Sequence, residues 1–361
     1  MISRFDRRAF VMLVAGVSFT RRVLGQHRAG RLDREQLLMY RDESGAVKPV
    51  RTPRDWLHRR AEILRGMQEV MGPLPGNDKR CALDVRVEEE ADAGSHVRRL
   101  ISYASEPGGR VPAYLLFPKA LPASGRRAAG VLCLHPTDNQ IGHKVVVGLG
   151  GRPNRQYAAE LAERGYVALA PSYPLLANYQ PDLKALGYQS GTMKAIWDNI
   201  RGLDLLETLP FVQKGAFGAI GHSLGGHNSV YTAVFDERIK AVVSSCGLDS
   251  YLDYKDGRIA GWTSDRYMPK LLQYQDRLMD IPFDFHEMIA ALAPRACFLN
   301  APLKDDNFKW QSVDRIVAAA RPVYKLYGKP ENLTVEHPDF AHDFPDEMRQ
   351  RAYTIFAQYL S

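Results

Sequence analysis

The chain has 361 residues, of which 45% are hydrophobic and 25% are charged, and its formal net charge is +7. These proportions are ordinary for a soluble globular protein and exclude a disordered chain or an extended coiled coil. The length suits one large α/β domain or two small ones, and no apolar run approaches the roughly 18 residues of a membrane-spanning helix. The four cysteines have no spacing typical of a zinc site, and we expect no disulfide framework among Cys81, Cys133, Cys246 and Cys297.

The positive charge is concentrated at the amino terminus. Residues 1–25 contain five arginines against a single acid, Asp6, and so carry more than half of the net charge. Basic residues elsewhere are interleaved with acidic ones, and no helix-turn-helix, zinc-finger or RNA-recognition signature occurs. We therefore expect no nucleic-acid partner.

Residues 1–25 have the layout of an export signal. A basic region ends in Arg7-Arg8, an apolar stretch covers residues 9–19, and small or modest residues follow. The arginine pair resembles the bacterial twin-arginine signal, although Asp6 stands where Ser or Thr is usual. This pattern favours a periplasmic or secreted protein with no stable membrane insertion after removal of the signal. The alternative is an amphipathic first helix of a cytoplasmic protein.

Residues 26–80 are expected to form a helical extension. The spacing predicts a helix from Thr52 to Leu74, because Thr52 can cap it, Pro53 occupies its first position, and Asp55 lies three residues after the cap. Apolar residues then recur at helical spacing until Gly72-Pro73 ends the run.

Residues 81–361 are expected to form one domain of the α/β class. Its first strands should be antiparallel: Leu83–Val87, Val97–Tyr103 and Val111–Phe117. Short apolar strands then alternate with amphipathic helices, which implies a mostly parallel sheet with helices on both faces. The predicted strands are Gly130–Leu134, Val167–Ala170, Gly215–Ile220, Ile239–Ser245, Ala296–Asn300 and Leu333–Val335, and the helices include Tyr157–Arg164, Thr192–Leu209, Leu224–Phe235, Trp310–Tyr327 and Asp346–Leu360. An insertion of about residues 247–282 is expected after the sixth strand, over a pocket.

The motif Gly221-His222-Ser223-Leu224-Gly225 lies between a predicted strand and a predicted helix. This strand–turn–helix setting is what a nucleophile elbow requires, with glycines where side chains would clash. The helix that follows favours negative charge near its start. We therefore expect Ser223 to be a nucleophile.

A serine nucleophile needs a base, and His342 is the candidate. It lies in a loop between the last strand and the terminal helix, where Phe340 and Phe344 could flank its ring. His337 is the competitor, but it abuts the strand.

The acid that orients the base should follow the strand before the histidine strand. Asp305 and Asp306 both follow Ala296–Asn300, and only one of them can face the imidazole. Asp249, after an earlier strand, is a third candidate.

The oxyanion of acyl transfer needs backbone donors. One is expected from Leu224, and the other from the loop after Gly130–Leu134, where Pro136 has no N–H and Thr137 is the simplest donor. Four histidines occur near these segments without the spacing of a metal site, and they are read as loop and supporting residues: His135, His143, His222 and His227.

From about Thr52 to the carboxyl end, the chain resembles the α/β-hydrolases, more narrowly the dienelactone hydrolase-like and acetyl xylan esterase-like serine esterases. The resemblance rests on Gly72-Pro73-Leu74-Pro75, Leu134-His135-Pro136-Thr137, Pro171-Ser172-Tyr173-Pro174, Gly221-His222-Ser223-Leu224-Gly225-Gly226 and Ala301-Pro302-Leu303-Lys304-Asp305-Asp306-Asn307-Phe308. It implies Asp305 as the acid. Dienelactone hydrolases themselves use a cysteine nucleophile, and the serine in this chain moves the expectation toward ordinary esters.

The sequence thus predicts a serine carboxylic-ester hydrolase with Ser223, Asp305 and His342 as triad, acting on a small-molecule or carbohydrate ester without cofactor or metal. A peptidase of the prolyl oligopeptidase type is disfavoured because the residues before the parallel strands are too few for a β-propeller. A non-catalytic binding protein of this fold would normally lack one of the three triad residues. The oligomeric state is left open.

Overall fold

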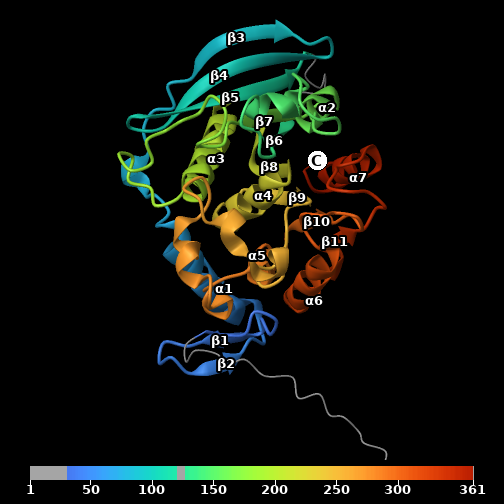
Figure 1. Cartoon of the computed structure of the whole chain (residues 1–361). Coiled ribbons are helices and arrows are strands. Elements are labelled where there is room, and N and C mark those ends of the chain that lie inside the picture. The colour runs from blue at the N-terminus through green and yellow to red at the C-terminus, as the bar shows by residue number, and fades with distance from the viewer. Residues whose placement is uncertain (1–30, 120–126, 361) are drawn as a thin grey trace, which may run out of the picture.

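The computed structural model describes residues 31–119 and 127–360, and its centre is a nine-stranded sheet (Figure 1). The strands lie in the order β11-β10-β9-β8-β6-β7-β5-β4-β3. The strands β6 to β11 are parallel to one another, whereas β5 pairs antiparallel with both β7 and β4, and β4 pairs antiparallel with β3. Their bounds are β3 Arg86–Asp92, β4 His96–Glu106, β5 Gly109–Pro118, β6 Ala128–Leu134, β7 Val167–Pro171, β8 Val212–His222, β9 Ile239–Ser245, β10 Ala296–Asn300 and β11 Leu333–Glu336. The predicted mostly parallel α/β sheet is confirmed.

Helices cover both faces of this sheet because successive strand residues point to opposite sides. Val131 and Cys133 of β6 belong to the core that packs under α2 and α7, whereas Leu132 and Leu134 belong to the larger core under the other helices. The first face carries α2 Tyr157–Glu163 and α7 Asp346–Tyr359, and the second carries α3 Gly191–Thr208, α4 Leu224–Phe235, α5 Phe285–Ala291 and α6 Trp310–Leu326.

The described part of the amino-terminal extension is a hairpin of β1 Met39–Arg41 and β2 Val47–Pro49, followed by α1 Pro53–Met71 and a short 3₁₀ helix, η1 Asn77–Lys79. Thr52 caps α1 and forms a capping box with Asp55, as the sequence predicted. The extension is joined to α5 by buried ion pairs, among them Arg59 Nη2 to Glu287 Oε1 at 2.8 Å. Residues 1–25, the predicted export signal, lie outside the described residues.

The predicted insertion contains four 3₁₀ helices: η3 Tyr254–Gly257, η4 Ile259–Trp262, η5 Pro269–Tyr274 and η6 Leu278–Asp280. It follows β9, which is the seventh strand of the large sheet in chain order and not the sixth. A further 3₁₀ helix, η2 Gly142–Val147, lies between β6 and α2, and η7 Pro330–Asn332 precedes β11.

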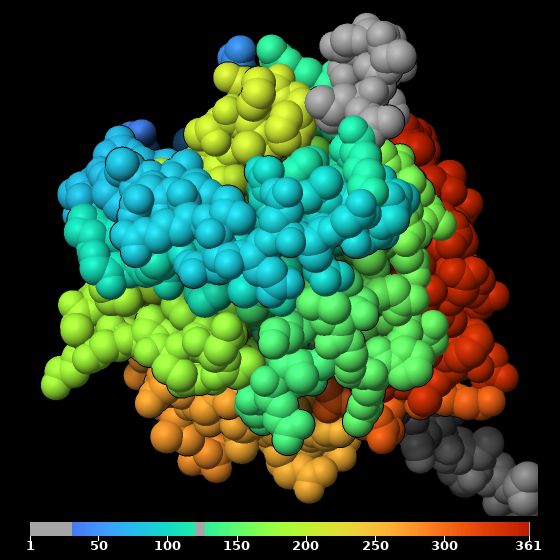
Figure 2. Space-filling model, turned by 90° about the horizontal axis from the view of Figure 1, so that it is seen from above, coloured from blue at the N-terminus to red at the C-terminus, as the bar shows by residue number. Residues whose placement is uncertain are grey.

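The edge strand β3 differs most from its predicted bounds, running over Arg86–Asp92 where Leu83–Val87 was expected. Nearly all its residues are exposed, and it contains three consecutive glutamates. The apolar pattern of the sequence therefore could not reveal the bounds of this strand. Figure 2 shows this antiparallel edge spread over the surface of the molecule. The central strands β9 and β10 and helix α4 have the predicted bounds.

No helix among residues 31–119 and 127–360 is both long enough and apolar enough to cross a membrane. All four cysteines are free thiols, and three of them are buried.

Candidate active site

Ser223 occupies a strained turn between β8 and α4. Its backbone has φ 55° and ψ −119°, a conformation that residues other than glycine rarely adopt. The flanking glycines are needed sterically: a Cβ on Gly221 would lie 2.2 Å from the carbonyl carbon of Gly225, and one on Gly225 would lie 1.9 Å from the Leu134 carbonyl oxygen. The Ser223 N–H donates to the Ser245 carbonyl at 2.8 Å. The motif therefore forms the predicted strand–turn–helix elbow.

Ser223 and His342 line the same cavity, which has a volume of about 440 Å³. The remaining lining residues are Pro136, Thr137, Asp138, Asn139, Gln140, Val145, Arg152, Arg155 and His222. Only Pro136 and Val145 among them have apolar side chains. The cavity is thus a polar one.

His342, in the loop before α7, contacts Asp305, in the loop between β10 and α6. Its Nδ1 lies 2.9 Å from Oδ2 of Asp305, whose side chain is 1% exposed. Oδ1 of Asp305 accepts the backbone N–H groups of Asn307 and Phe308 at 2.8 and 3.0 Å. Burial raises the pKa of Asp305, but the hydrogen bond and charge of His342 and these two N–H groups outweigh burial and hold the pKa below its ordinary value. The carboxylate is therefore ionised and turned toward the imidazole.

The competing residues have other partners. His337 Nδ1 contacts the Ala301 carbonyl at 2.7 Å, and its Nε2 contacts Asp314 at 3.0 Å. Asp306 is exposed. Asp249 is buried and accepts the Lys309 N–H at 3.2 Å, and burial, the main cause, raises its pKa to about 7.

The rings that flank His342 are not those expected from the sequence. His222 lies 4.8 Å and Phe308 lies 5.7 Å from the His342 ring, measured between centroids. Phe340 is 41% exposed, and Phe344 packs instead against His222 and Tyr157. The β10–α6 loop, which also carries Asp305, supplies Phe308, whereas the sequence predicted only the acid of this loop beside His342.

The two expected oxyanion donors lie at one edge of the sheet. Leu134 of β6 pairs with Gly221 of β8, so the segments carrying Thr137 and Leu224 leave the sheet side by side. Leu224 is the first residue of α4, where a backbone N–H has no acceptor within its own helix. Thr137 lines the cavity, and its Oγ1 lies 3.1 Å from the Tyr267 hydroxyl in the insertion.

The four nearby histidines are buried and uncharged. Burial lowers the pKa of His135 to about 4 and those of His143 and His227 to about 3, and it takes the pKa of His222 well below its ordinary value. His135 accepts the Tyr173 N–H at Nε2, 2.9 Å away, which fixes a loop position. The interpretation as loop and supporting residues agrees with these contacts.

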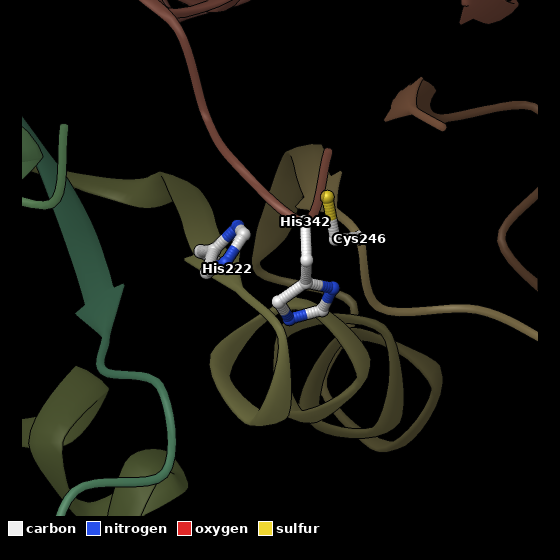
Figure 3. A group of neighbouring side chains, drawn as sticks. All are labelled: His222, Cys246 and His342. Atoms are coloured by element: carbon white, nitrogen blue, oxygen red, sulfur yellow. The ribbon is translucent and has the colours of Figure 1, made fainter. Parts of the chain in front are cut away.

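Three side chains with metal-binding atoms meet beside the cavity: His222, Cys246 and His342, whose donor atoms lie within 4.8 Å of one another. Figure 3 shows that they come from three segments, the end of β8, the residue after β9 and the loop before α7. His222 Nδ1 lies 3.0 Å from Ser245 Oγ, and the Cys246 thiol donates to the Asp343 carbonyl at 3.3 Å. Burial raises the pKa of that thiol well above its ordinary value, so the thiolate that a metal requires is disfavoured. His222 and Cys246 therefore suit a hydrogen-bonded support beside His342 better than they suit a metal site.

Arg155 and Asp343 were not identified from the sequence. Arg155 lies in the polar loop between η2 and α2, and Asp343 directly follows His342. Their ion pair spans 188 residues of chain, and no spacing rule links such distant residues.

Comparisons with known proteins find similarity in sequence and in fold. A sequence model of the dienelactone hydrolase family matches residues 143–258, which include Ser223. The protein named "Putative hydrolase YtaP" of Bacillus subtilis is 23% identical over 83% of this chain and 100% of its own length. A glucuronoyl esterase from Solibacter usitatus has a TM-score of 0.72 at 19% identity, covering 90% of this chain and 97% of that one. An acetyl xylan esterase from Paenibacillus sp. R4 has a TM-score of 0.55 at 16% identity, covering 78% of this chain and 90% of that one. Residues 143–258 are therefore similar to the dienelactone hydrolase family, and the chain has the α/β-hydrolase fold of these solved structures.

Proposed function

We propose that the protein is a serine carboxylic-ester hydrolase. One observation carries the proposal. Ser223, on a strained elbow, shares a cavity with His342, and the Nδ1 atom of His342 is hydrogen-bonded to the buried, ionised carboxylate of Asp305. This is the set of groups that activates a serine hydroxyl for attack on a carbonyl. The domain match and the esterase fold neighbours support the same reaction.

The mechanism assigns one role to each group. His342 takes the proton from Ser223 as the hydroxyl attacks the ester carbonyl, and Asp305 stabilises the imidazolium that forms. The N–H groups of Leu224 and Thr137 hold the oxyanion. His342 then gives the proton to the leaving alcohol, and water, activated by the same ring, hydrolyses the acyl-enzyme.

The substrate proposed is a polar ester, such as an acetylated or other carbohydrate ester. Nine of the eleven residues that line the cavity offer polar or charged side chains, which suit hydroxyl-rich groups better than long acyl chains. The glucuronoyl and acetyl xylan esterases among the structural neighbours support the same substrate class. The proposed reaction requires no binding partner besides the ester substrate and water.

The test is ester turnover by the purified protein and its Ser223→Ala variant. A panel of p-nitrophenyl acyl esters, acetylated xylan and a glucuronate ester should show turnover, with short or sugar esters above long-chain ones. Ser223→Ala should abolish turnover and should also prevent labelling by a fluorophosphonate. Labelling that persists in Ser223→Ala would overturn the assignment, and turnover of proline-containing peptides alone would replace it with a peptidase.

The proposed location is the periplasm or the exterior of a bacterial cell, and it rests on Arg7-Arg8 and the apolar stretch of residues 9–19. Replacing both arginines with lysine should retain the protein in the cytoplasm of a bacterial host, as measured by cell fractionation. Equal export of the variant would remove this assignment.

A further inference from the structure

A buried arginine contacts the loop that carries His342. Arg155 is 4% exposed and lies just before α2. Its Nη1 pairs with the carboxylate of Asp343, and its Nη2 donates to the His342 carbonyl at 3.3 Å. The guanidinium also donates to the carbonyls of Pro153 and Asn154, both at 3.2 Å. One side chain therefore ties the wall of the cavity to the proposed base and to its neighbour.

Asp343, the residue after His342, is hydrogen-bonded through both its side chain and its backbone carbonyl. Asp343 Oδ2 accepts from Asn154 Nδ2 at 2.8 Å, and burial of this carboxylate is outweighed by Arg155 and Asn154, which lower its pKa. Its backbone carbonyl accepts from Asn300 Nδ2 at 3.0 Å and from the Cys246 thiol at 3.3 Å. Side chain and backbone of Asp343 are thus anchored separately.

The anchoring matters because residues 337–345 contain no helix or strand that could hold the imidazole in place. Proton transfer requires the ring within hydrogen-bond reach of both the serine and the acid, and a displacement of about 1 Å can cost on the order of 10²-fold in rate. Asp305 constrains only Nδ1 of the ring. The backbone that carries the ring needs its own constraint.

We propose that Arg155 is the positioning residue for His342, acting through Asp343 and the His342 carbonyl to hold the imidazole between Asp305 and Ser223. This rests on the proposed ester hydrolysis. Arg155 contacts the backbone of His342 and not its ring. Because Arg155 also lines the cavity, its replacement is expected to change KM as well, so the positioning role is measured by kcat and by the state of the His342 ring.

The charge of Arg155 has a second consequence for the same ring. His222 lies beside His342, and burial first, then the Arg155 charge, lowers its pKa. His222 consequently stays uncharged and adds no like charge beside the imidazolium that forms on His342 during turnover.

Arg349 offers a matched control. It is also 4% exposed, and it donates to the Phe344 carbonyl at 2.7 Å and to Asn154 Oδ1 at 3.0 Å. It therefore supports the same loop one residue further on, through contacts that do not include His342 or Asp343.

The experiment compares Arg155→Met, Arg155→Lys and Arg349→Met for kcat, KM and the midpoint of thermal unfolding. Arg155→Met should lower kcat on the order of 10²-fold, and Arg155→Lys should recover part of this loss of kcat because it keeps the charge. Arg349→Met should lower the unfolding midpoint as much as Arg155→Met while keeping kcat within about threefold of the wild type. Equal losses of kcat in the two methionine variants, or unchanged kcat in Arg155→Met, would overturn the proposal. If Arg155→Met does not fold, the Arg155→Lys and Arg349→Met pair carries the same comparison.

A measurement that needs no substrate separates this proposal from the proposed function. The Nδ1 proton of His342, hydrogen-bonded to Asp305, should give a downfield proton resonance in the wild type and in Arg349→Met. The resonance should broaden or disappear in Arg155→Met because the ring is no longer held. Its persistence in Arg155→Met would overturn the positioning role whether or not esters are hydrolysed. An inactive wild type with the expected resonances would instead refute only the esterase.

Discussion

The Nδ1 atom of His342 lies 3.0 Å from Oδ1 and 2.9 Å from Oδ2 of Asp305. The Asp305 side chain is 1% exposed and the His342 side chain is 20% exposed, so the pair is closed on the acid side and open on the side of the cavity. A carboxylate that orients a base and a base that meets a substrate need this asymmetry.

Asp305→Asn should lower kcat on the order of 10⁴-fold, because the amide holds the ring but favours the wrong tautomer. Asp306→Asn should change kcat by less than about tenfold, which is ~1.4 kcal/mol, because this side chain is exposed. Steady-state kinetics on one ester, with fluorophosphonate titration of the active serine, checks both. If kcat falls in Asp306→Asn and not in Asp305→Asn, the acid is Asp306. If kcat falls only in Asp249→Asn, the acid is Asp249, which follows β9.

His342→Ala should lose several orders of magnitude in kcat, since the members of a triad act as a unit. His337→Ala should keep kcat within about tenfold, because its ring is occupied by the Ala301 carbonyl and by Asp314. The measurement is kcat and the unfolding midpoint for both variants. Similar losses of kcat in folded variants would mean that the loop conformation, and not one ring, governs activity.

The buried acid Asp249 should make stability fall as the pH rises. Its pKa is raised from the ordinary 3.8 to about 7, mainly by burial, so between these values the folded protein keeps a proton that the unfolded chain has lost. The free energy of unfolding should therefore decrease across this interval by up to ~1.4 kcal/mol per pH unit from this group. Urea unfolding at pH 5, 6, 7 and 8 should give a shallower decrease for Asp249→Asn, and identical slopes would contradict the prediction.

Gly225→Ala should destabilise the protein and lower kcat together, since its Cβ would meet the Leu134 carbonyl oxygen at 1.9 Å and push α4 away from β6. The Leu224 N–H moves with the start of that helix. Gly218→Ala on β8 is the control, because its Cβ would meet side-chain atoms of Leu360 and Phe356, which can shift, at about 3 Å. The thermal unfolding midpoint and kcat are measured for both variants. An unchanged kcat in Gly225→Ala would show that the elbow tolerates a larger distance between α4 and β6.

The alternation of strands and helices was readable from the sequence wherever burial on both faces produced continuous apolar runs. The bounds of Ile239–Ser245, Ala296–Asn300 and Leu224–Phe235 follow directly from those runs. The exposed edge strand β3 and the hairpin of β1 and β2 lack such runs, and the helix α5 is only seven residues long. β1 and β2 pair with each other, and β3 pairs with the next strand β4, so these exposed strands are held by backbone pairing and not by burial of apolar side chains.

The site divides in the same way. The elbow at Ser223 was predictable from the sequence, because the five-residue motif with its two glycines lies between a readable strand and a readable helix. The resemblance implied Asp305 and not Asp306, but spacing alone left the two equivalent; the contact with His342 arises only in the tertiary structure, where the β10–α6 loop meets the loop before α7. The ion pair of Arg155 with Asp343 was also decided there, because a hydrogen bond between residues 188 positions apart has no counterpart in local spacing.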